Sequence, residues 1–309
     1  MPFNIKHKKR LLGLVTVILV VLLLTTIGAG VSATSAEFQN IILIGWDGAG
    51  RSNIKELLAL NKLPNLQALI DEGIIVAIDA ERVTDTKAGW SAILTGYYPE
   101  TTGVFSNTKY RSIPDGLTLF ERLENYYGDD RIFTLFLSGK SKINNVSADV
   151  GYPFYNAKPD IDKYYAGDYP NEKIASWTLM AIENNYTGQM FLFVLFREPD
   201  FEGHTYGENS AQYANAIVDN DNWIGLIIQK LKDLGVYNNT LIYIVSDHGF
   251  DEGGYRHLDA PYEFLATNDV QVIRNGFRVD ITPTIYNALG LLFGTDGHSL
   301  RQLYQQPVW

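Results

Sequence analysis

Residues 40–48 read NIILIGWDG, a short apolar run that ends in an aspartate and a glycine. An apolar run without polar alternation is typical of a strand that is buried on both faces of a parallel sheet. The rest of the chain alternates between similar apolar runs and segments with helical spacing. We therefore predict an α/β fold with a mostly parallel central sheet and helices on both faces.

The same pattern places the remaining elements. Strands are expected at 40–45, 74–78, 131–137, 190–196 and 241–245. Helices are expected at 53–60, 65–71, 88–94, 117–127, 171–184, 211–234 and 281–289. The tyrosine-rich stretch 138–170 lacks a clear period, and we expect it to be a cap or a long loop over the site. No linker divides the chain after residue 36, which predicts one domain over residues 37–309.

Carboxylates and histidines follow the carboxyl ends of three expected strands. Asp47 follows the first, the segment REPDFEGH at 197–204 follows the strand 190–196, and Asp247-His248 follows the last, with His257 further along. Ligands of open α/β sheets bind at this edge, and carboxylates combined with imidazoles suit zinc or manganese. Each cluster alone is also what a turn or a surface pair looks like. Their occurrence at three equivalent strand ends predicts a metal site.

The composition excludes several classes of function. The chain has 25 basic and 35 acidic residues, a formal net charge of −10 at pH 7. This charge repels nucleic-acid backbones, so we expect no nucleic-acid partner. A small phosphorylated substrate is compatible with it, because bound metal ions reverse the sign of the local charge. There is no cysteine, which excludes disulfides, thiolate nucleophiles and zinc–thiolate sites.

The N-terminus has the order of a secretory signal. A basic segment from Lys6 to Arg10 precedes an apolar run over residues 11–31, and small residues follow. The run is also about long enough to span a bilayer. A cleaved signal and an uncleaved anchor over residues 1–36 therefore both stay open. Either one sends the rest of the chain across the membrane, so we expect an exported protein, secreted or anchored to the outer face of the cell membrane.

A further segment carries a candidate nucleophile. Residues 84–100 read TDTKAGWSAILTGYYPE, with Thr86 at the start of an expected helix and Thr95-Gly96 at its end. Thr86 alone would be interpreted as a helix cap. In context, the segment resembles the nucleophile segment of the alkaline-phosphatase superfamily, most closely that of the type I phosphodiesterases, or nucleotide pyrophosphatases. Asn107 and the segment from Glu198 to His204 are similar to motifs of the same family, and the resemblance covers most of residues 38–300.

Lys87 departs from the aromatic or apolar residue that is common after the nucleophile in this family. Two interpretations of it stay open. It is either a solvated surface charge or a cation that meets a substrate anion.

The resemblance implies an alkaline-phosphatase-like fold and a site for two divalent metal ions, with Thr86 as nucleophile and Asn107 as a donor to the phosphoryl group. It implies that one ion, zinc or else manganese, is held by Asp47, Thr86, Asp247 and His248. The other would be held by Asp200, His204 and a third histidine. We favour His257 as this ligand, with His298 as the alternative.

The expected chemistry also has a physical basis. A threonine hydroxyl is a poor nucleophile at neutral pH, and a directly bound dication favours its alkoxide. We therefore expect hydrolysis of a small phosphate ester through a phospho-threonine, with a diester or pyrophosphate preferred. The alternatives are a phosphomonoesterase, a transferase of phosphorylated head groups and a non-enzymatic surface binding protein on an inactive scaffold. The sequence carries no signal for the oligomeric state.

Overall fold

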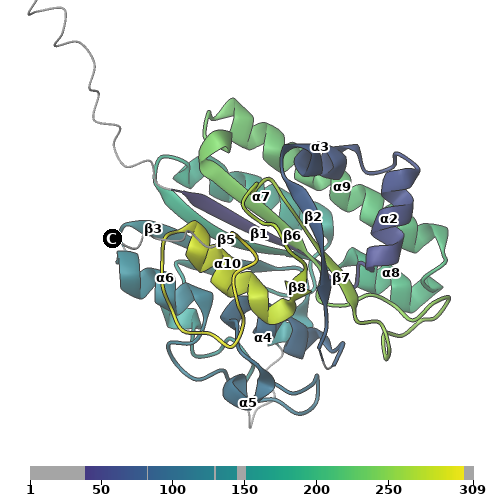
Figure 1. Cartoon of the computed structure of the whole chain (residues 1–309), viewed down its shortest axis with the longest axis horizontal. Helices are drawn as coiled ribbons and strands as arrows, with labels where there is room; N and C mark the ends of the chain where they lie inside the picture. The colour runs from purple at the N-terminus through teal and green to yellow at the C-terminus, as the bar shows by residue number, and fades with distance from the viewer. Residues whose placement is uncertain (1–38, 82, 129, 145–150, 303–309) are drawn as a thin grey trace, which may run out of the picture. The chain divides into compact units, whose positions relative to one another are not determined.

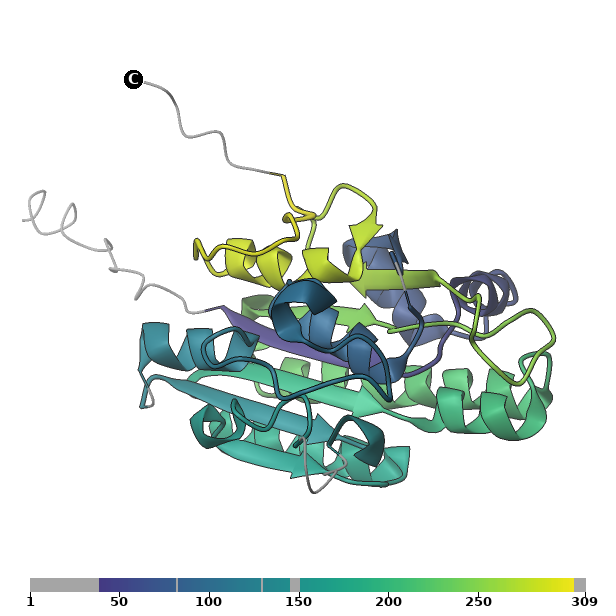
Figure 2. The same cartoon turned by 90° about the horizontal axis from the view of Figure 1, so that it is seen from below.

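The computed structural model describes residues 39–302 except 82, 129 and 145–150. These residues form one eight-stranded sheet in the order β4-β3-β5-β1-β6-β7-β2-β8. In Figure 2 the purple strand β1 lies in the middle of the sheet, and the teal strands β3 and β4 lie below it. The strands are β1 (Asn40–Trp46), β2 (Ile74–Asp79), β3 (Ile132–Ser138), β4 (Lys163–Ala166), β5 (Gln189–Phe196), β6 (Thr240–Val245), β7 (Tyr262–Thr267) and β8 (Gly276–Phe277).

Helices cover both faces of the sheet, as expected. One face packs against α4 (Thr86–Thr95), α6 (Leu119–Tyr127) and α10 (Ile281–Ala288), which lie at the lower left of the sheet in Figure 1. The other face packs against α2 (Arg51–Ala59), α3 (Pro64–Glu72), α7 (Asn171–Asn185) and α9 (Ala211–Asp233). The short helices α5 (Pro99–Thr102) and α8 (Glu198–Tyr206) lie in connections at strand and helix ends.

Burial on both faces explains the apolar runs. Every residue of β1 is buried, with Ile41 and Leu43 in one core and Ile42 and Ile44 in the other. The neighbours β5 and β6 pair with β1 in parallel, and their side chains divide between the two cores in the same way. The α/β fold class with a mostly parallel sheet is therefore confirmed.

Three parts of the fold differ from the expectation. Strand β7 was not predicted, and it runs antiparallel to both of its neighbours, β6 and β2. Residues 198–206 form helix α8, which was not predicted. The stretch 138–170 contains an edge strand, β4, that pairs in parallel with β3, so the expectation of a cap or long loop was wrong there. Tyr164 of β4 stacks on Phe136 with ring centroids 4.7 Å apart, which makes it a packing residue.

The expected leader or anchor over residues 1–36 lies outside the described residues. Among the helices that the structure does describe, none is long and apolar enough to cross a membrane.

The aromatic centre of the sheet provides a test of the core. The ring of Phe193 on β5 packs against Trp90 and Phe136, with centroids 5.4 and 5.1 Å away. We expect Phe193→Ala to lower the free energy of unfolding by about 3–5 kcal/mol, because the lost ring leaves a cavity. Urea unfolding measures this change. Met180→Ala on α7, where the side chain is 57% exposed, is the control and should change it by less than about 0.5 kcal/mol; similar losses in both variants would contradict the assigned core.

Candidate metal centre and nucleophile

The three predicted clusters meet because their strands are neighbours. Strands β5, β1 and β6 lie side by side and parallel, so their carboxyl ends reach the same edge of the sheet. Asp47 follows β1, Asp247 and His248 follow β6, and α8 brings Asp200 to this edge after β5. All four side chains are buried, with exposed fractions between 0% and 6%.

One ring nitrogen lies at the centre of this group. The Nε2 atom of His248 is 3.5 Å from Asp200 Oδ1, 3.5 Å from Asp247 Oδ2 and 3.7 Å from Asp47 Oδ1. On the far side of the ring, Nδ1 is 2.9 Å from the carbonyl oxygen of Gly249. That carbonyl fixes the proton on Nδ1 and leaves a lone pair on Nε2. A lone pair that faces carboxylate oxygens is the arrangement expected around a cation.

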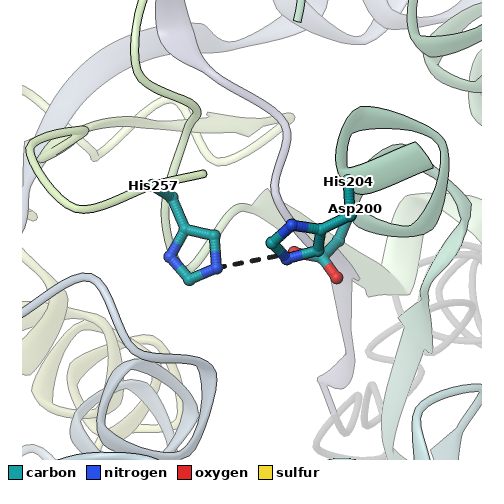
Figure 3. A group of neighbouring side chains, drawn as sticks. All are labelled: Asp200, His204 and His257. Atoms are coloured by element: carbon teal, nitrogen blue, oxygen red, sulfur yellow. Dashed lines mark ion pairs between the residues drawn. The ribbon is translucent and has the colours of Figure 1, made fainter. Parts of the chain in front are cut away.

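A second group lies on the other side of Asp200. Asp200, His204 and His257 offer ligand atoms that all lie within 4.8 Å of one another, and Figure 3 shows their side chains converging. The Nε2 atoms of His204 and His257 are 3.3 and 4.0 Å from Asp200 Oδ1. His204 Nδ1 lies 2.8 Å from the carbonyl oxygen of Tyr255, which again directs Nε2 toward the carboxylate. Asp200 therefore borders both groups, whereas the resemblance assigned it to one.

The residues present fit divalent metal ions. Asp200 Oδ1 and Asp247 Oδ2 are buried and have no hydrogen-bond partner among the described residues. Both face His248 Nε2. A buried, unpaired carboxylate oxygen is costly, and a metal ion bound between these atoms and the imidazole nitrogens would remove that cost. Carboxylate and imidazole ligands without thiolate suit zinc or manganese.

Burial shifts the pKa values of these side chains toward their uncharged forms. Burial raises the pKa of Asp247 well above its usual range, and the nearby charges of Asp47 and Asp200 add to the effect. Burial lowers the pKa of His248 to about 3 and that of His257 to about 4. The two imidazoles are thus neutral at physiological pH, the form that binds metals, and their rings stack 3.8 Å apart.

Thr86 is the first residue of α4, and its hydroxyl does not cap the helix. The residue before the helix is Asp85, which makes no side-chain cap bond. The Oγ1 atom of Thr86 instead lies 3.5 Å from His248 Nε2. The structure therefore brings the predicted nucleophile to the atom around which the carboxylates gather, and the interpretation of Thr86 as a plain cap is wrong.

Asn107 is held by the same helix start. Its Oδ1 accepts a hydrogen bond of 3.0 Å from the backbone N–H of Lys87, so its Nδ2 donors are directed elsewhere.

Lys87 is buried: the residue is 5% exposed, and its ammonium lies 3.4 Å from the centre of the Tyr110 ring. The interpretation of Lys87 as a solvated surface charge is therefore wrong.

Lys140 is a site residue that the sequence analysis missed. Its ammonium bonds to Asp47 Oδ1 and, at 2.5 Å, to Asp200 Oδ2. Burial opposes its charge, but the three aspartates outweigh burial and raise its pKa. In turn, burial would raise the pKa of Asp200, yet the Lys140 ammonium holds it well below its usual range. Ser138-Gly139-Lys140 follows β3 at the same sheet edge, and this strand-end position was the available signal.

Two further residues were missed. The indole N–H of Trp90 donates to Asp47 Oδ2 at 3.2 Å. The guanidinium of Arg278 donates to the backbone carbonyls of Asp247, at 3.1 Å, and Val83, at 2.6 Å. It thereby ties the segment before Thr86 to a predicted metal ligand. Neither residue has a sequence signal, because both act through contacts made only in the folded chain.

His298 lies apart from both groups. Its side chain is exposed, its backbone N–H donates to Asp280 at 2.7 Å, and its carbonyl accepts from Arg274. It lines a separate cavity of about 530 Å³ together with Tyr98 and Asp296.

These positions separate the two candidate histidines. We expect His257→Ala to lose about one bound metal ion per chain, because it removes one of three ligands around Asp200. His298→Ala is the matched control and should bind as much metal as the unchanged protein. Elemental analysis after dialysis against zinc measures both. Metal loss in the His298 variant alone would refute the assignment of His257.

Comparison with known proteins gives the family. Residues 41–292 match the model of the type I phosphodiesterase / nucleotide pyrophosphatase family. The chain is 25% identical over 244 residues to bis(5'-adenosyl)-triphosphatase ENPP4 of Homo sapiens, a match that covers 76% of this chain and 53% of the relative. It is also 25% identical over 206 residues to ectonucleotide pyrophosphatase/phosphodiesterase family member 1 of Rattus norvegicus, covering 62% and 22%. The match thus spans about half the length of ENPP4 (53%) and 22% of the length of the second relative.

Solved structures agree on the fold. The sulfatase-like protein yidJ of Bacteroides fragilis superposes with a TM-score of 0.66 at 14% identity, covering 84% of this chain and 76% of its own. The lipoteichoic acid synthase LtaP of Listeria monocytogenes gives a TM-score of 0.57 at 18% identity, covering 89% and 78%. Because the family model spans most of the sequence, this chain belongs to the type I phosphodiesterase/nucleotide pyrophosphatase family.

Proposed function

We propose that the chain is a metal-dependent hydrolase of phosphate esters, with residues 37–309 as its catalytic domain. One observation carries the proposal. The hydroxyl of Thr86 and three buried carboxylates, those of Asp47, Asp200 and Asp247, all lie 3.5–3.7 Å from the same nitrogen, His248 Nε2. A hydroxyl at the start of a helix, beside ligands for a dication, is well placed to act as a nucleophile.

We assign one ion to Asp47, Thr86, Asp247 and His248, and the other to Asp200, His204 and His257. When bound, two divalent ions, zinc or else manganese, supply the positive charge that favours the Thr86 alkoxide and offsets the charge of the phosphoryl group.

We assign the attack on phosphorus and the stabilisation of the developing charge to residues of the chain. Thr86 Oγ1 attacks the phosphorus and the leaving group departs, which gives a phospho-threonine that water then hydrolyses. The N-terminus of α4, where Thr86 lies, favours the negative charge that develops there. The Nδ2 group of Asn107 is available to a phosphoryl oxygen, because its Oδ1 is already bound to the Lys87 N–H.

The substrate we propose is a phosphodiester or a pyrophosphate. The family description supports this choice, as does the name of the relative ENPP4, a bis(5'-adenosyl)-triphosphatase.

We also propose that the chain acts outside the cytoplasm. The basic and apolar order of residues 6–31 supports export, whether those residues are cleaved or remain as an anchor.

Thr86 provides the test of this function. We expect Thr86→Ala to lower kcat for bis-p-nitrophenyl phosphate about 10³-fold or more, because the nucleophile is lost. Thr86→Ser is the matched control, since it keeps a hydroxyl, and it should retain measurable turnover. Initial rates with added zinc or manganese measure both. Unchanged hydrolysis in Thr86→Ala would rule out the phospho-threonine route.

A second measurement reports on the intermediate itself. Acid quenching during turnover of bis-p-nitrophenyl phosphate should trap a p-nitrophenyl phosphoryl group on the unchanged protein, because one ester bond of the diester stays intact, and mass spectrometry should locate that group on the peptide that contains Thr86. A protein that hydrolyses the ester without ever carrying phosphate would contradict the proposal.

A further inference from the structure

Lys140 is a buried cation for which the proposed two-metal chemistry gives no role. Its side chain is 9% exposed, and its ammonium bonds to Asp47 Oδ1 and Asp200 Oδ2. These two aspartates belong to different metal groups in the proposed function. The ammonium therefore lies where the two groups adjoin.

The backbone around Lys140 is fixed. The hydroxyl of Ser138 accepts from the Lys140 N–H at 3.1 Å and donates to the Lys140 carbonyl at 3.0 Å. The N–H of Gly139 donates to Leu195 on the neighbouring strand β5. A side chain at position 139 would place its Cβ 2.9 Å from the Tyr169 carbonyl oxygen, so only glycine fits. These contacts fix the backbone of residues 138–140 in the conformation from which the Lys140 side chain reaches Asp47 and Asp200.

The ammonium and the metal ions use different oxygens of Asp200. The ammonium bonds to Oδ2, whereas Oδ1 faces the histidines and has no hydrogen-bond partner in the described part of the chain. At Asp200 the bound ions therefore need not displace Lys140, whereas at Asp47 the ammonium and an ion would share Oδ1, which also lies 3.7 Å from His248 Nε2. An ammonium has three donors, and two of them are used by Asp47 and Asp200. The third has no acceptor among residues 39–302 that the structure describes.

We propose that the third N–H of Lys140 binds a non-bridging oxygen of the phosphoryl group under attack. Lys140 then contributes more to the binding of a phosphoryl group with a second negative charge, on the same phosphate or on the adjoining phosphate of a pyrophosphate, than to the binding of a singly charged diester. The inference rests on the proposed function. Its physical basis is that the Coulomb attraction grows with the charge of the phosphoryl group, and burial keeps solvent from screening it.

Two esters that differ in charge test the proposal. We expect Lys140→Met to lower kcat/KM for p-nitrophenyl phosphate, a dianion, about 10²-fold, the usual effect of one lost donor. The loss for bis-p-nitrophenyl phosphate, a monoanion, should be about tenfold smaller. The affinity of the metal-loaded protein for inorganic phosphate, measured by titration calorimetry, should fall about tenfold. Lys142→Met, in the same connection and partly exposed, is the matched control and should change none of these values.

Two results would overturn the proposal. In the first, both esters lose activity equally while the metal content falls, which would mean that Lys140 only positions the carboxylates. In the second, kinetics and phosphate affinity both stay unchanged. If the unchanged protein hydrolyses neither ester, the proposed function fails. The phosphate titrations of the unchanged protein and of Lys140→Met then still decide whether Lys140 binds a phosphoryl oxygen.

Discussion

The arrangement of the site depends on three aspartate carboxylates that are buried together at the carboxyl edge of the sheet. Asp47, Asp200 and Asp247 are at most 4% exposed and converge on one imidazole nitrogen. In their ionised form, a single ammonium, that of Lys140, stands against three carboxylates. Buried ions without partners cost several kcal/mol each, so a cation bound among these carboxylates would lower that cost. Binding of such ions and stability of the fold are therefore linked.

Close packing behind the carboxylates keeps them in place. Gly45 lies against Trp90, and any side chain at position 45 would clash with the indole ring, whose N–H holds Asp47. Gly89 serves the same purpose on α4, because a Cβ there would lie 2.9 Å from both the Arg278 guanidinium and Asp247 Cβ. The two glycines let helix α4, which begins at Thr86, approach the strand ends closely. The residues of the site are thus held by close packing between α4 and the strand ends.

Local sequence patterns were enough to predict the central strands and part of the site. Apolar runs located the strands, and the rule that ligands gather at the carboxyl edge located Asp47, Asp247 and His248. The same patterns missed β7, whose pairing depends on tertiary neighbours, and they missed Lys140, because a lysine after a strand end is ordinarily a surface residue. They also could not show that Asp200 borders both groups, since that depends on the orientation of helix α8. Such facts arise from packing between segments distant in the chain.

The choice between His257 and His298 as a metal ligand depends on strand β7, which was not predicted. Strand β6 ends at Val245, and β7 begins at Tyr262 and runs back beside it. The connection between two antiparallel neighbours starts and ends at one edge of the sheet, so residues 246–261 stay beside the site. The Thr84 hydroxyl, which donates to the His257 carbonyl, attaches this connection to the segment that carries Thr86. With β7 parallel instead, a long crossover would have carried His257 away. The antiparallel strand therefore keeps a third imidazole, that of His257, beside Asp200, whose other carboxylate oxygen contacts Lys140.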